Sequence, residues 1–174
     1  YAEYDRSEEL YSEALAIQQE FLGETHPETV RTISQLGWLY SLLGRYDESA
    51  DMFARAVALR RQVYGDHHPN VASTLSGFAQ MRLAQGEYAQ AESLFREANS
   101  IHRERNPDGI HPGALAWLAR AVAPQGRTEE ATLLYEEAVA QIPTNPTAVD
   151  ARIINDFAGH LERAGDLTGA ERRY

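Results

Sequence analysis

The chain has 174 residues, a formal net charge of −10, 43% hydrophobic and 24% charged residues, and no cysteine. This balance of apolar and charged residues is typical of a protein with a packed core. The negative charge argues against nucleic acid and anionic membrane surfaces as partners, because both attract basic proteins. The absence of cysteine excludes disulfide bonds and thiol catalysis, and on that basis we expect a cytoplasmic protein.

All 16 basic residues are arginine, a bias that indicates GC-rich coding, so we expect a bacterial source. The first residue is Tyr1 rather than methionine, and we interpret the chain as a piece of a longer protein. No run of residues approaches the roughly 20 apolar positions of a membrane-spanning helix.

Glycines recur along the chain with similar residues after them, for example GRYDESADMF from Gly44 and GEYAQAESLF from Gly86. The segments that start at Gly126 and Gly165 align with these two, and the successive spacings are 42, 40 and 39 residues. His-Pro pairs recur in phase with the glycines, at 26–27, 68–69 and 111–112. Such self-similarity predicts a repeat protein in which each repeat is one supersecondary unit.

Between these markers, apolar residues recur at intervals of three and four, which is the spacing of one face of an α-helix. In chain order this pattern predicts one helix over about 3–21, two within 27–63, two within 69–104, two within 112–141, one over about 147–163, and one from about 167 to 174. The glycines end the first helix of each pair, because glycine adopts the left-handed cap conformation at little cost. The His-Pro pairs open the first helices, because proline suits a first helical turn.

Two details of the first helices lead to structural expectations. Small residues recur where the two helices of a pair should cross closely, and we expect them to be buried: Gly37, Ala79, Ala119 and Ala158. The third first helix should be about one turn short and irregular, because Gly113 follows its His-Pro pair directly and Pro124 ends it.

The pattern I-x-x-L-G-x-x-Y at 33–40, followed by S-x-x-x-F at 49–53, resembles the tetratricopeptide repeat (TPR) signature, with isoleucine replacing the usual tryptophan. The long units are similar to those of the kinesin light chain subclass. The resemblance implies an all-α, right-handed superhelical solenoid of antiparallel helix pairs, whose first helices line a concave groove. It also implies one array over 1–174, truncated at both ends, with a partial unit at 1–25, full units at 26–67, 68–110 and 111–145, and a partial unit at 146–174.

The sequence contains no motif for catalysis, metal binding or a cofactor. The histidines of the His-Pro pairs lie about one repeat apart, too far to converge on one ion, and we interpret them as helix caps. Paired carboxylates such as Glu129-Glu130 fall on second helices, where we expect a solvent-exposed face rather than an acid–base pair. The absence of lysine excludes the phosphate-binding loop Gly-x-x-x-x-Gly-Lys. We therefore expect a protein that is not an enzyme.

The resemblance also implies which side chains face the groove, because these lie at fixed positions along the first helices. Carried over to this sequence, the candidate peptide-binding residues are Arg31, Ser34, Trp38, Ser73, Gln80, Arg120, Arg152 and Asn155. Arginine can hold a carboxylate through two hydrogen bonds, amides can bond a peptide backbone, and tryptophan is a common interface anchor. A second interpretation stays open, in which Arg31 and Arg120 pair with acids of neighbouring helices and Trp38 serves packing.

We therefore expect a scaffold that binds a peptide or protein segment, acidic and extended, in the concave groove. Two alternatives remain open. One is a structural spacer or self-association module that acts through end-to-end contacts of an open solenoid. The other is a sensor arm of a larger signalling ATPase or enzyme.

Overall fold

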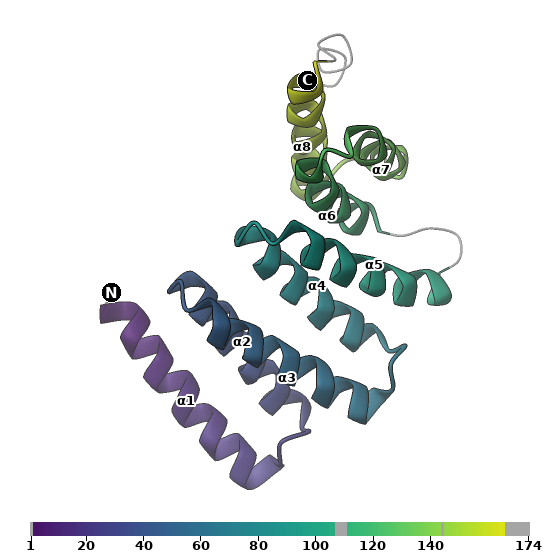
Figure 1. Cartoon of the computed structure of the whole chain (residues 1–174). Helices are drawn as coiled ribbons and strands as arrows, with labels where there is room; N and C mark the ends of the chain where they lie inside the picture. Colours follow the sequence, from purple (N-terminus) through teal and green to yellow (C-terminus); the bar gives the residue numbers. More distant parts are fainter. Residues whose placement is uncertain (1, 107–110, 144, 166–174) are drawn as a thin grey trace. The chain divides into compact units, whose positions relative to one another are not determined.

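The computed structural model describes residues 2–106, 111–143 and 145–165. These residues form eight α-helices and one short 3-10 helix, with no strand among them (Figure 1). The elements are α1 (Ala2–Leu22), α2 (Pro27–Leu42), α3 (Tyr46–Tyr64), α4 (Pro69–Ala84), α5 (Tyr88–Arg105), α6 (Pro112–Val122), η1 (Ala123–Gln125), α7 (Thr128–Ala140) and α8 (Ala148–Ala164). The all-α class and these helices are confirmed, whereas the helix predicted over 167–174 lies outside the described residues.

The chain folds as two compact units, Tyr1–Met81 and Arg82–Tyr174. Unit 1 contains α1, α2, α3 and most of α4, and unit 2 contains α5, α6, η1, α7 and α8. Among the helices of the described ranges, none combines the length and the apolarity that crossing a bilayer requires.

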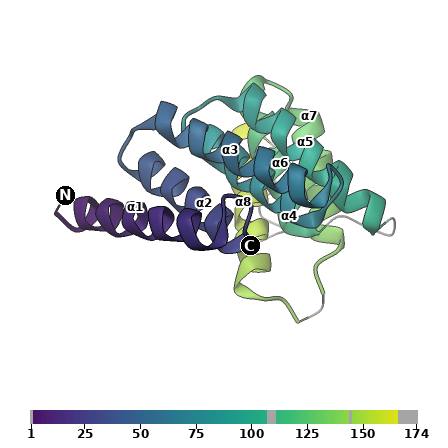
Figure 2. The ribbon, with the colours of Figure 1, turned by 90° about the horizontal axis from the view of Figure 1, so that it is seen from below.

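In unit 1, α2 and α3 pack as a pair and α1 lies beside α2 (Figures 1 and 2). The crossing of α2 and α3 is close because Gly37 has no side chain: a Cβ atom there would lie 3.1 Å from the ring of Phe53. At the same point the Ser49 hydroxyl donates a buried hydrogen bond of 2.7 Å to the Gly37 carbonyl. The expectation that a small residue is required at this crossing is thus confirmed.

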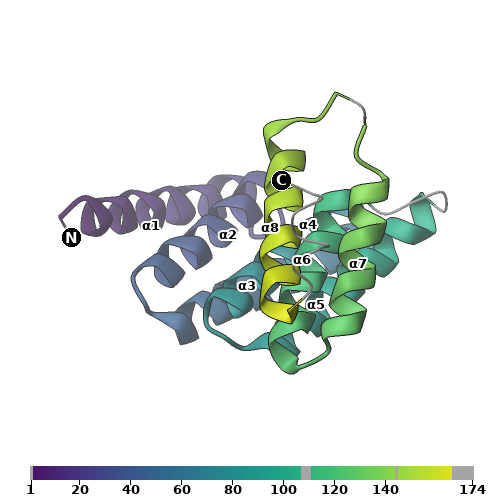
Figure 3. The ribbon, with the colours of Figure 1, turned by 90° about the horizontal axis from the view of Figure 1, so that it is seen from above.

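In unit 2, α6 and α7 form a pair and α8 packs against both (Figure 3). Ala119 of α6 and Ala158 of α8 have no exposed surface, as the repeat pattern predicts. Tyr135 of α7 stacks on Phe157 of α8 with ring centroids 5.3 Å apart, and both rings are buried. An aromatic pair therefore fixes the spacing between these two helices.

Helix α6 has 11 residues, whereas α2 has 16. It ends at Val122 because Pro124 has no N–H group with which to continue the helical hydrogen bonds. The chain then makes the single 3-10 turn η1 and leaves it through Gly126, in the left-handed conformation at φ 78° and ψ 6°. The predicted irregularity of the third first helix is confirmed.

The histidines of the His-Pro pairs are helix caps. In His26, His68 and His111 the ring Nδ1 accepts a hydrogen bond from the backbone N–H two residues later, at 3.3, 3.1 and 3.1 Å respectively. An N-cap acceptor of this kind satisfies one of the backbone N–H groups that a helix leaves unpaired at its start. This recurrent structural role explains why the three histidines recur with the repeat.

Candidate functional site

One face of unit 2, formed by α6 and α8, carries an indole with two guanidinium groups over it. Trp117 of α6 stacks on Phe95 of α5, with ring centroids 6.2 Å apart. The guanidinium carbon of Arg120 lies 4.4 Å from the indole centroid, and that of Arg152, on α8, lies 5.9 Å from it. A cation within about 6 Å of an indole face is attracted by the ring's quadrupole. Trp117, Arg120 and Arg152 therefore form one group, the arginine–tryptophan cluster.

The arginine–tryptophan cluster has an excess of positive charge. A terminal nitrogen of Arg120 lies 3.9 Å from a carboxylate oxygen of Asp156, at the outer limit of an ion pair, and the Arg120 side chain is 41% exposed. Arg152 is exposed and forms no ion pair with another described residue. Asp156 thus lies near Arg120 alone, and both guanidinium groups retain hydrogen-bond donors for an external anion.

The corresponding face of unit 1 lacks this excess charge. Arg31 forms an ion pair with Glu28, three residues earlier on α2, so its charge is balanced within the same helix. Trp38 packs edge-on against Phe53, with ring centroids 5.5 Å apart, and keeps 38% of its surface exposed. The Ser34 hydroxyl donates to the carbonyl four residues earlier on α2. Unit 1 therefore presents an indole edge without a free cation beside it at these positions.

The remaining sequence candidates are spread over two helices. Ser73 is exposed and Gln80 is half-buried on α4, and Asn155 is exposed on α8. Of the eight candidate residues, the structure brings Arg120 and Arg152 around one ring, and it places Arg31, Ser34 and Trp38 on α2.

Trp117 was missed by the sequence reasoning, although it is the centre of the cluster. The signal that could have found it is its spacing from Arg120, because residues three apart on a helix are neighbours on its surface. The contribution of Arg152 to the same ring depends on how α6 and α8 pack, and no local pattern contains that information.

A poorly exposed carboxylate fixes the start of α7 against α5. Glu92 of α5 accepts hydrogen bonds from Arg127 at 2.7 and 2.8 Å, from Arg96 at 2.8 Å and from Gln125 at 2.8 Å. Burial opposes ionisation of Glu92, but the two guanidinium groups and the amide outweigh it and hold the pKa of the carboxyl below its usual range. Arg96 and Arg127 also bind Glu130, so part of the acidic face expected on α7 belongs to an ion-pair network.

The fold and this surface define a class, the helical-repeat proteins, whose helix pairs present side chains to a partner. Proteins with this fold are typically non-catalytic. A tetratricopeptide repeat model matches residues 2–62 and 42–104, and a second tetratricopeptide repeat model matches residues 82–152. The chain belongs to the tetratricopeptide repeat family, whose members generally serve as protein-interaction scaffolds.

Solved structures of the kinesin light chain type share the fold. One is a Podosopora anserina protein of the kinesin light chain type, with nearly identical TPR-like repeats. The chain is 22% identical to it over 99% of this chain and 84% of that chain, with a TM-score of 0.80. It is 20% identical to BtubC (BKLC) from P. vanneervenii, over 98% of this chain and 70% of that chain, with a TM-score of 0.81. MamA is 16% identical over 99% of this chain and 85% of that chain, with a TM-score of 0.65. None of the curated proteins compared with the chain matches it.

Proposed function

We propose that this chain is a non-catalytic interaction module that binds an acidic, extended segment of a partner protein on the α6–α8 face of unit 2. The observation that carries the proposal is the pair of guanidinium groups that lie near the indole of Trp117 at the surface. Of the two, Arg120 lies 3.9 Å from the carboxylate of Asp156, so their combined charge remains positive. Arginine binds a carboxylate through two parallel hydrogen bonds, and an arginine already ordered by an aromatic ring loses less side-chain freedom on binding.

The chemistry of the face also favours an extended segment over a folded acidic surface. An extended peptide rises about 3.3 Å per residue, so successive acidic side chains on one side of it are spaced for neighbouring arginines. The exposed amide of Asn155, on the same helix as Arg152, can pair with peptide N–H and C=O groups. Because both arginines are exposed, binding should be weak and should weaken further with ionic strength. We place the module in the cytoplasm, in keeping with the cysteine-free sequence.

The two tryptophans of the chain allow a direct test, because each reports on a different unit. A panel of short acidic peptides, each with one apolar residue, is titrated against the Trp38→Phe and Trp117→Phe variants. The matched control peptides carry glutamine and asparagine in place of every acid. We expect an acidic peptide to change the emission of Trp117 saturably in the first variant and to leave that of Trp38 in the second variant unchanged. Equal binding of the neutral control peptides, or a change in the emission of Trp38 alone, would contradict the proposal.

A second candidate function is self-association, and it rests on the exposed apolar side chains of α1. Leu10, Ile17 and Phe21 are 50%, 50% and 75% exposed, and their spacing of seven and four residues puts them on one face of the helix. Sedimentation velocity over a wide concentration range tests this function. We expect the mass to rise with concentration in the wild type and to stay monomeric in Phe21→Glu. A mass independent of concentration in the wild type would exclude this function.

A further inference from the structure

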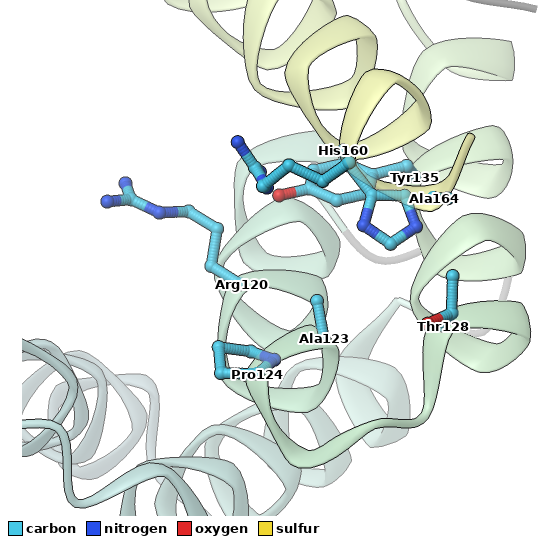
Figure 4. A pocket seen from close by; sticks show the side chains of 8 residues that line it. Arg120, Ala123, Pro124, Thr128, Tyr135, His160 and Ala164 are labelled. Carbon is cyan, nitrogen blue, oxygen red and sulfur yellow. The ribbon is translucent and has the colours of Figure 1, made fainter. Parts of the chain in front are cut away.

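The break at the end of α6 leaves a hollow in unit 2, which we call the socket. Its volume is about 400 Å³. Its lining comes from α6, η1, α7 and α8 and consists of Arg120, Ala123, Pro124, Thr128, Tyr135, His160, Arg163 and Ala164 (Figure 4). Since α6 stops at Val122, it is Ala123 and Pro124 of η1 that line this side of the socket.

The socket is lined by a hydroxyl that is not used by any other described side chain or backbone group. Tyr135 is 2% exposed, yet its hydroxyl forms no hydrogen bond with another described residue. Figure 4 shows this hydroxyl on the side of the socket from which Arg120 extends. Because this hydroxyl lines the hollow with its donor unused, it can donate to an acceptor that enters from outside.

The charges around that hydroxyl favour an anionic acceptor. Arg120 and Arg163 line the socket from α6 and α8, and Asp156 is the acid that acts on the Tyr135 hydroxyl. Burial, followed by the charge of Asp156, raises the pKa of Tyr135 to about 12, so the phenol is protonated and donates at neutral pH. A carboxylate could therefore accept from Tyr135 and pair with a guanidinium group at the same time.

The second polar group of the socket, His160, is held by α7. It is 3% exposed, and its Nε2 lies 2.9 Å from the hydroxyl oxygen of Thr132. That hydroxyl itself donates to the carbonyl of Thr128, so its oxygen can accept from His160. Burial lowers the pKa of His160, the Thr128 carbonyl raises it and the charge of Arg163 lowers it, and the net shift is downward. An anion in the socket would oppose that shift, which makes His160 a reporter of occupancy.

We propose that the socket binds the side-chain carboxylate of an acidic residue in the partner segment. This inference rests on the proposed function, because the segment supplies the acid. Arg120 belongs both to the arginine–tryptophan cluster and to the socket lining, so a segment on the α6–α8 face can place an acid in the socket. An extended segment carries side-chain carboxylates at many points but only one terminal carboxylate, so we assign the socket to a side chain and let the probes exclude a chain end.

The test uses three capped single residues as probes and the imidazole and phenol NMR signals of the full chain as readouts. N-acetyl-glutamate methylamide carries only a side-chain carboxylate, N-acetyl-glutamine methylamide is its neutral analogue, and N-acetyl-glutamine carries only a terminal carboxylate. We expect the first probe to move the Tyr135 and His160 signals saturably and to raise the measured pKa of His160, and the other two to leave them unchanged. An equal response to the neutral probe, a response to the terminal carboxylate alone, or no response would overturn the inference.

Variants separate the socket from general effects of charge. Tyr135→Phe keeps the ring and removes the hydroxyl, so binding of the glutamate probe should weaken about ten-fold while circular dichroism stays that of the wild type. Arg163→Gln should weaken it similarly, and Arg103→Gln, an exposed arginine of α5, should not. If the glutamate probe fails while acidic peptides still bind through Arg152, the socket is wrong and the proposed function stands. If the probe binds and no peptide does, the proposed function is wrong and the socket stands.

Discussion

The α2 face of unit 1 and the α6 face of unit 2 come from the same part of the repeat, yet they offer a partner different chemistry. On each face, the residue three positions before an arginine determines whether the charge of that arginine is paired. Arg31 follows Glu28 and is neutralised by it, whereas Arg120 follows Trp117 and lies over its ring, only loosely paired with Asp156. The neighbour within one helical turn therefore decides whether the charge of each arginine is available.

The two faces also differ in how their helices end. Helix α2 continues for 16 residues and ends at the glycine turn, whereas α6 ends early at Val122, two residues before Pro124, beside the socket. The helix crossings behind the two faces follow the same rule, with Gly37 in unit 1 and Ala119 in unit 2.

The largest effect is expected at the helix crossings. Ala119→Leu should lower the free energy of unfolding by about 1–3 kcal/mol, because a larger side chain must displace packed neighbours. Gly37→Leu should cost more, because even its Cβ atom would lie 3.1 Å from Phe53. Urea denaturation measures both, with the exposed Ala151→Leu as the control. A cost for Ala119→Leu no greater than that of the control would show that the helix register is wrong.

A smaller effect is expected at two equivalent carboxylates, Glu8 and Glu92. Each bonds the arginine that precedes a second helix, Arg45 or Arg127, but the side chain of Glu92 is 11% exposed and that of Glu8 is 28% exposed. Glu92→Gln should therefore destabilise the protein by about 1–2 kcal/mol, and Glu8→Gln by less than about 1 kcal/mol. Equal costs measured by urea denaturation would contradict this difference between the units.

The ionised carboxylate of Glu92 also predicts that the stability of the protein depends on pH. The folded pKa of Glu92 lies below its unfolded value, so its contribution is fully present above the unfolded pKa of about 4.3 and is lost as the pH falls through the folded pKa. The stabilities of the wild type and Glu92→Gln should therefore converge as the pH drops below about 4. A constant difference between pH 7 and acid conditions would show that the charge of Glu92 is not what stabilises α7.

The smallest effect on stability is expected at the helix break. Pro124→Ala restores the backbone N–H that α6 lacks at this point and should change the free energy of unfolding by less than about 1 kcal/mol. It should let α6 continue as α2 does, which narrows the socket. We expect a slightly stronger helical signal by circular dichroism and at least about ten-fold weaker binding of the glutamate probe. Unchanged probe binding would mean that the break does not form the site.

Much of the fold was predictable because it repeats. The glycine and His-Pro markers gave the helix limits to within a few residues, and the small residue at 37 and 119 identified the crossings, since both depend on local backbone and steric rules. The site was less predictable. The Glu28–Arg31 pair follows from a spacing of three residues, but the meeting of Arg152 with Trp117 depends on the packing of helices that are far apart in sequence.

The socket was even harder to predict from the sequence than the arginine–tryptophan cluster. Pro124 predicted that α6 would be short, but not that a buried phenol would face the space beyond it. Tyr135 occupies the recurrent aromatic position of the second helix, where Phe53 and Phe95 stand in the earlier repeats. Only its hydroxyl distinguishes it from these two residues. A sequence pattern assigns all three to the core, and only the placement of the neighbouring helices gives the hydroxyl a possible role.

We propose that the exposed charge of unit 2, and not that of unit 1, binds an acidic segment. The most direct test is equilibrium binding of the best acidic peptide to the wild type and to three charge-reversal variants, Arg120→Glu, Arg152→Glu and Arg31→Glu, with the helical signal checked in each. We expect affinity to fall about ten-fold or more for each of the first two and to change less than about two-fold for Arg31→Glu. Equal losses in all three, or a loss in Arg31→Glu alone, would show that the exposed charge of unit 2 is not what binds the segment.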